Sequence, residues 1–186
     1  AGGAPATTAR AIASALGPSI IPLARHPDPL VRAKAILLVA RSSSDAAIDA
    51  IVAGLDDSSE AVQRVALAAV ALPSADGTRA PASARAVAAV GRALEGHESW
   101  AIRVLAAGAM GRLGAAGAGS EATRRLTSAA TADSYALVRQ AALEALAQYD
   151  GPAARAVGAR MASADAEPRV REVARAIAAG ERPRPE

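Results

Sequence analysis

The stretch DSYALVRQAALEAL, residues 133–146, decides the fold. Asp133 stands five positions before the β-branched Val138, and Arg139 follows directly. From Val138 onward, apolar side chains recur at the spacing of one helix face. A short polar residue ahead of such a run can cap a helix by accepting hydrogen bonds from its free N–H groups. The stretch therefore predicts a capped, alanine-rich helix.

The same pattern returns along the whole chain, at steps of 31, 40, 36 and 32 residues. Its β-branched positions are Val31, Val62, Ile102, Val138 and Val170. The polar residues five positions earlier are His26, Asp57, His97, Asp133 and Asp165. The first copy predicts a helix whose apolar spacing comprises Val31, Ala35, Leu38 and Val39.

A second, shorter helical pattern follows each of the first four copies, bounded by Gly, Pro, Ser and Asp as helix ends usually are. These segments are Ser44–Leu55, Pro81–Glu95, Ser120–Ala130 and Pro152–Ser163. Upstream, Thr8–Leu16 and Ser19–Arg25 form a further pair, and Glu167–Ala179 is a first helix without a second. The repeating unit is therefore a pair of helices joined by a turn.

This pattern resembles the HEAT repeat family, including its bacterial HEAT-like type, over roughly residues 5–180. The resemblance implies an all-α fold, a right-handed α–α superhelix (a solenoid) of about five helical hairpins. We expect one domain over residues 1–180 and a tail at 181–186. The expected repeats lie near residues 5–25, 28–55, 57–95, 97–130, 133–163 and 165–180.

The resemblance also implies a structural ladder, in which Asp and Arg side chains connect neighbouring repeats. Its members would be Asp57, Arg103, Asp133, Arg139, Asp165 and Arg171, together with Arg32. Three positions depart from the family pattern, because Gln63 replaces Arg, and His26 and His97 replace Asp. These charged residues are expected to hold the repeats together and not to form a site.

The composition excludes several classes of protein. Of 186 residues, 55 are alanine, and there is no Cys and no Phe. Without Cys, this chain can form neither a disulfide scaffold nor a cysteine metal site. A β-sandwich is excluded because it is built from β-branched and aromatic residues, which alanine cannot replace. The formal net charge is only +3, and no apolar run approaches the roughly 20 residues of a membrane helix. We therefore predict no membrane insertion and, by default, a cytoplasmic protein.

No catalytic motif stands out, so we predict a protein that is not an enzyme, with no catalytic, cofactor-binding or metal-binding residues. The glycine-rich segment Gly108–Gly119 lacks the spacing of a phosphate-binding loop. It is better explained by close helix packing followed by a flexible connection. His97-Glu98 resembles the His-Glu pairs of HEAT-like di-iron hydroxylases, but that family needs several such pairs on facing helices.

Two groups of residues are candidates for binding a partner. Trp100 and Tyr135 begin first helices in consecutive repeats, near His97, where they either anchor a partner or fill a gap in the core. The second helices carry the other group: Arg85, Arg92, Arg124, Arg125, Arg155 and Arg160. In this architecture the second helices usually line the concave face, so these arginines either are merely solvated or form a basic surface there. Such a surface would suit a protein partner of complementary charge or a nucleic-acid backbone.

The sequence therefore favours a non-catalytic scaffold or module that binds another protein through the concave or edge surface of the solenoid. One alternative is a HEAT-like protein that binds nucleic acid through the second-helix arginines. The shortage of Lys and aromatic residues weighs against it. A HEAT-like lyase or hydroxylase is the third hypothesis. The sequence does not identify the partner.

Overall fold

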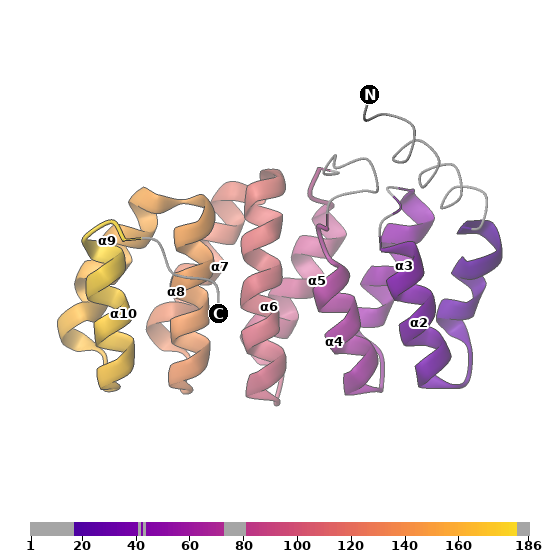
Figure 1. The fold of residues 1–186 in the computed structure, drawn as a ribbon, viewed down its shortest axis with the longest axis horizontal. Helices are drawn as coiled ribbons and strands as arrows, with labels where there is room; N and C mark the ends of the chain where they lie inside the picture. The colour runs from indigo at the N-terminus through magenta and orange to yellow at the C-terminus, as the bar shows by residue number, and fades with distance from the viewer. Residues whose placement is uncertain (1–16, 41, 43, 73–80, 182–186) are drawn as a thin grey trace, which may run out of the picture. The chain divides into compact units, whose positions relative to one another are not determined.

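The computed structural model describes residues 17–40, 42, 44–72 and 81–181. All regular elements within these residues are helical (Figure 1). They are η1 (Ile21–Arg25), α2 (Pro29–Val39), α3 (Asp45–Leu55), α4 (Glu60–Ala69), α5 (Ala84–Gly96), α6 (Trp100–Leu113), η2 (Gly114–Ala118), α7 (Gly119–Ala132), α8 (Ala136–Tyr149), α9 (Gly151–Ala164) and α10 (Pro168–Ala178). The predicted all-α solenoid of helical hairpins is confirmed. The predicted helix Thr8–Leu16 lies outside the described residues.

The helix bounds follow from local capping. Ser44 accepts a hydrogen bond from the backbone N–H of Ala47 and starts α3, and Asp150 does the same for α9 through Ala153. Helix α5 begins at Ala84, three residues after the predicted start at Pro81. The reason is that the carbonyl of Ser83 accepts the first helical hydrogen bond, from the N–H of Val87. Serine is a strongly preferred residue at that position.

The chain divides into two compact units between Ala89 and Val90. Unit 1, up to Ala89, contains η1 and α2 to α4, and α2 packs on η1, α3 and α4. Unit 2, from Val90, contains α6 to α10, and α5 spans the division. The expectation of a single domain over residues 1–180 stays a prediction.

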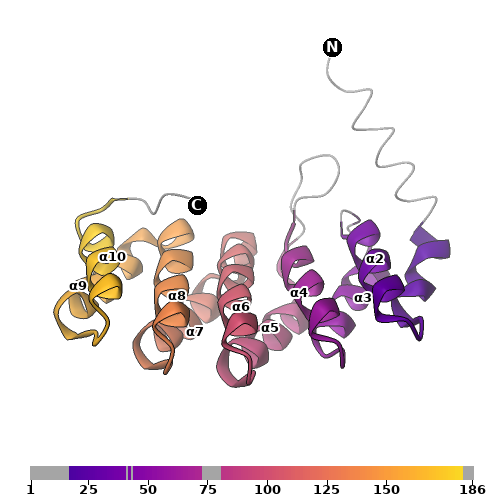
Figure 2. The same cartoon turned by 60° about the horizontal axis from the view of Figure 1, so that its bottom comes forward.

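In unit 2, the first helices α6, α8 and α10 lie side by side, and the second helices α7 and α9 lie behind them (Figures 1 and 2). Small residues allow this close packing. Ala106, Ala107 and Ala109 are fully buried in α6. A Cβ atom added to Gly158 of α9 would lie 2.9 Å from the carbonyl oxygen of Ala174 in α10, so these two helices touch through their backbones.

The glycine-rich segment after α6 is a helical turn with a kink at Gly117, whose backbone angles are not helical. Helix α6 continues to Leu113, and η2 is a π-helical turn in which Gly117 has a φ of 111°, in the left-handed region. Gly114 has no room for a side chain, because the ring of Tyr149 lies against it. The predicted close packing is present, and the predicted flexible connection is a short π-helical turn.

No helix among the described residues is both long and apolar enough to span a lipid bilayer.

Candidate functional site

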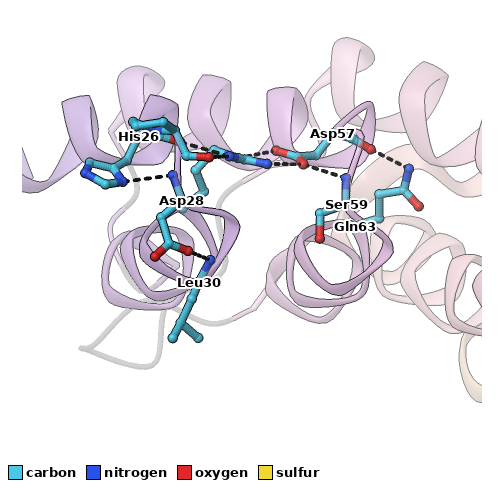
Figure 3. Close-up of polar contacts among 8 residues, drawn as sticks. His26, Asp28, Leu30, Asp57, Ser59 and Gln63 are labelled. Atoms are coloured by element: carbon cyan, nitrogen blue, oxygen red, sulfur yellow. Dashed lines mark hydrogen bonds and ion pairs between the residues drawn. The ribbon is translucent and has the colours of Figure 1, made fainter.

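The turns that precede the first helices carry a ladder of Arg–Asp ion pairs. In unit 1, Arg32 Nη1 donates to the backbone carbonyls of His26 and Pro27, at 2.9 and 2.8 Å. Its Nε and Nη2 donate to the two carboxylate oxygens of Asp57, both at 2.7 Å. Figure 3 shows His26 and Asp57, which belong to the two turns that this arginine connects. One guanidinium therefore binds both the turn before its own helix and the turn of the next repeat.

Unit 2 repeats this geometry twice. Arg103 donates backward to the carbonyls of His97 and Glu98, and forward to Asp133 at 2.8 and 3.0 Å. Arg139 donates backward to the carbonyls of Asp133 and Ser134, and forward to Asp165 at 2.7 Å for both bonds. Because both partners of each pair are mostly buried, these ion pairs are more strongly coupled than surface pairs.

The residues that depart from the ladder pattern still make hydrogen bonds to their own turn, but they lack the charged group that forms the ion pair with the neighbouring repeat. Gln63 Nε2 donates backward to the carbonyl of Asp57 at 2.7 Å, but an amide has no guanidinium fork for a forward ion pair. The Nδ1 atoms of His26 and His97 each accept from the backbone N–H two residues on, both at 3.1 Å. Asp57 accepts in the same way from Ser59, at 2.8 Å. Histidine therefore replaces the capping function of aspartate without its charge.

The ladder changes the ionisation of its acids. The hydrogen bonds from Arg139 hold the pKa of Asp165 below its ordinary value, against the opposing effect of burial. For Asp133, burial is the largest influence and would raise the pKa, but the hydrogen bonds from Arg103 and from the N–H of Tyr135 prevail and lower it. Both acids are therefore charged at neutral pH.

The structure brings Trp100 and Tyr135 together on the surface of unit 2. Their ring centroids lie 6.2 Å apart with an interplanar angle of 16°, so the rings stack. Trp100 remains 41% exposed and Tyr135 49% exposed, so neither ring fills a gap in the core. The Cζ atom of Arg103 lies 5.3 Å from the Tyr135 ring centroid, at cation–π distance. His97, in the turn before α6, accepts from the N–H of Ser99.

Several of the predicted second-helix arginines are already ion-paired within the chain. Arg85 contacts Asp49 at 2.6 Å, and Arg124 contacts Glu121 at 2.8 Å. Arg125 binds both Glu121 and Glu95. Hydrogen bonds from Arg124 and then Arg125 lower the pKa of Glu121 to about 2. Arg92, Arg155 and Arg160 are exposed. The pairing reduces the positive charge that this surface offers to a nucleic acid.

The exposed large apolar residues among the described residues lie on η1, the first helices and the turns that lead into them. They are Leu23, Leu30, Leu37, Leu38, Trp100, Tyr135 and Leu137. Sequence reasoning missed the leucines of α2, because apolar residues at helical spacing are typical of a buried face. Leu38 is 63% exposed, so its assignment to the apolar face with Val39 was wrong. At the matching positions of α6 and α8, Ala109 and Ala145 are buried, so a comparison of repeats would not have revealed the exposure of Leu38.

A surface cavity of about 590 Å³ lies where α8, α9 and α10 meet. Tyr149, Arg155, Ile177 and Glu181 line it. The Tyr149 hydroxyl lies 3.0 Å from Thr123 Oγ1, which donates to Asp150. The tyrosine therefore belongs to the network that caps α9.

Comparisons with known proteins identify the fold. Residues 87–178 match HEAT repeats. The chain is a HEAT-like helical repeat protein. Its structure is similar to that of one chain in the structure of the complex of CpcE and CpcF of phycocyanin lyase from Nostoc sp. PCC7120, with a TM-score of 0.62 and 20% sequence identity. The match covers 89% of this chain and 99% of that chain. No curated protein matches the sequence.

The comparison corrects one prediction. We expected a protein that is not an enzyme, because the sequence shows no catalytic motif, no phosphate-binding loop and only one His-Glu pair. That prediction was wrong: the similar structure is a phycocyanin lyase. HEAT-like repeats therefore occur in an enzyme, and the missing motifs do not exclude catalysis.

Proposed function

We propose that this HEAT-like protein binds a protein partner through the aromatic pair, Trp100 and Tyr135. One observation carries the proposal: two of the three aromatic side chains of the chain stack on each other at the surface, with 41% and 49% of their area exposed. Trp and Tyr are enriched among the residues that dominate binding energy at protein interfaces.

The pair is held in place before any partner arrives. Asp133 fixes Arg103, which lies over the Tyr135 ring, and Asp133 also accepts from the N–H of Tyr135 at 2.8 Å. Association costs less free energy when the contacting side chains are already ordered. The exposed Leu137, at 48%, adds apolar area two residues along α8.

Alanine substitution of the pair tests this function. The Trp100→Ala/Tyr135→Ala variant and the parent chain would each be used as bait in native cell extract, with mass spectrometry of the captured proteins. Leu23→Ala is the matched control, because Leu23 is 43% exposed and lies in unit 1. We expect the double variant to lose a partner that the parent and the control both retain. A large fall in melting temperature would instead mean that the pair stabilises the fold.

A role in a lyase is the second candidate, and the similarity to the CpcE–CpcF complex favours it. That structure contains two different subunits, so binding a partner and acting in a lyase are compatible functions. The test is to incubate the chain with phycocyanin, alone and together with any captured partner, and to follow the visible absorbance spectrum. An unchanged spectrum in both mixtures would remove this candidate.

A further inference from the structure

Helix α6 has an apolar face that keeps exposed area. Five of its residues that are not buried recur at helical spacing, and we call them the α6 strip: Trp100, Ala101, Val104, Leu105 and Gly108. The one charged residue of α6 before Arg112 is Arg103, which is buried and bound to Asp133. A helix at a protein surface normally carries charged or polar residues on its solvent side. The α6 strip therefore has the composition of a face that another chain covers.

The other first helices differ from α6 on this side. At positions matching Val104, Leu105 or Gly108, each of them carries a charged residue that keeps exposed area: Lys34 in α2, Arg64 in α4, Glu144 in α8 and Glu172 in α10. The absence of charge is thus a property of α6 and not of the repeat.

The apolar surface continues from α6 onto α8, which lies beside it (Figure 1). The Tyr135 ring stacks on Trp100, and Leu137 is 48% exposed at the start of α8. Together with the α6 strip, these residues give unit 2 a surface of aromatic and small apolar groups on two adjacent helices. Such a surface suits the apolar side of an amphipathic helix.

The charges at the rim of this surface are acidic. Glu98, two residues before Trp100, is exposed and makes no ion pair within the part of the chain that the structure describes. Glu144 of α8 is half-buried, and its carboxylate accepts from a neutral amide. The charge of Arg103 is neutralised by Asp133. These carboxylates would repel an anionic lipid surface and favour a protein segment that carries a cation.

Helix α2 of unit 1 presents a face of this kind. Leu30 and Leu37 are 64% and 50% exposed, and Lys34 lies between them on the same face. The other charged residue of α2 is Arg32, whose guanidinium is bound to Asp57. Lys34 is exposed and has no ion pair with a described residue. The face is therefore apolar with one available positive charge.

The exposure of this face belongs to the outer side of a first helix. In α8, which packs between α6 and α10, the positions matching Leu30 and Leu37 are Leu137 and Glu144, and both keep exposed area. Leu38 lies outside the face, because the matching residue of α8 is buried. The two faces also agree in length. Leu30 to Leu37 spans about 10 Å along its helix, and Trp100 to Gly108 about 12 Å.

We propose that α2 of one copy of this chain docks on the α6 strip and the aromatic pair of a second copy, with Lys34 beside Glu98 and Glu144. This names the partner of the aromatic pair and therefore rests on the proposed function. The two faces differ, so the contact is heterologous and can continue from copy to copy. Because each face is only about two helical turns long, we expect weak association, in the micromolar range or above.

Sedimentation velocity of the full chain tests the proposal, because each face can be removed by itself. The variants are Leu30→Ser/Leu37→Ser, which damages the α2 face, and Trp100→Ala/Tyr135→Ala, which damages the acceptor face. We expect the sedimentation coefficient of the parent to rise with concentration, and each variant alone to stay a monomer. An equimolar mixture should form a dimer and nothing larger, since each variant keeps one intact face. The mixture also serves as a test of folding, because a misfolded variant could not restore association.

Two single substitutions complete the test. Leu23→Ser removes an exposed leucine of η1, outside the α2 face, and should associate like the parent. Lys34→Glu reverses the charge of the α2 face and should weaken association at least about threefold. A parent that stays monomeric, an assembly that survives either double variant, or a mixture that fails to associate would overturn the proposal. If the parent is monomeric while Trp100→Ala/Tyr135→Ala still loses a captured protein, the proposed function stands and a second copy is the wrong partner.

Discussion

The ladder arginine joins two repeats because its guanidinium offers two separate edges. Arg139 uses Nη1 to hold the turn ahead of its own helix, and Nε with Nη2 to hold Asp165. Lysine offers a single point charge and could not satisfy both turns at fixed angles.

Asp165→Asn tests the energy of this ion pair. Asparagine keeps an oxygen for the N–H of Glu167 but removes the charge that Arg139 binds, so we expect a loss of about 2–4 kcal/mol in the free energy of unfolding at pH 7. The measurement is urea unfolding followed by circular dichroism. Glu172→Gln, at an exposed acid of α10, is the control and should change stability by less than about 0.5 kcal/mol.

The same variant should alter the response to acid. Because Arg139 lowers the pKa of folded Asp165, its stabilisation is complete above the unfolded pKa of about 4 and is lost as pH falls through the lower, folded value. The difference in stability between the parent and Asp165→Asn should therefore shrink as pH falls below about 4. A difference that stays constant down to pH 2 would contradict this assignment.

The helices themselves were predictable, because each depends on local signals. Capping residues and the period of the pattern placed α3, α7 and α9 within two residues of their observed bounds. The stacking of Trp100 on Tyr135 depends on which turns meet in space. The sequence could indicate that Trp100 and Tyr135 were neighbours, but it could not distinguish a core position from a surface one.

At the scale of helix packing, two glycines of unit 2 should respond in opposite ways to alanine. A Cβ on Gly158 would lie 2.9 Å from the Ala174 carbonyl oxygen, so Gly158→Ala must push α10 away and should cost about 1–3 kcal/mol. Gly108 has only a side-chain nitrogen of Arg112 at 3.8 Å, so Gly108→Ala should stabilise α6 by up to about 1 kcal/mol. Thermal melting of both variants measures this. Equal shifts would mean that helix propensity, and not contact between α9 and α10, decides the outcome.

At the scale of the whole molecule, the period and the alanine content predicted the repeat architecture, since neither depends on a single residue. The division into two compact units was not predicted. It falls within α5, whose apolar pattern resembles that of the other second helices. Stability in a solenoid is approximately a sum of repeat energies and of interfaces between neighbours, so local damage should stay local.

Hydrogen exchange tests whether each unit responds by itself. Asp57→Asn removes the carboxylate that binds Arg32 in unit 1, and Asp133→Asn removes the one that binds Arg103 in unit 2. We expect the first variant to lower amide protection in α2 and α4, and the second to lower it in α6 and α8. Each variant should leave the most protected amides of the other unit within about threefold of the parent rate, because its broken contacts all lie within one unit. A uniform loss of protection from α2 to α10 in either variant would show that the chain opens as a single cooperative body.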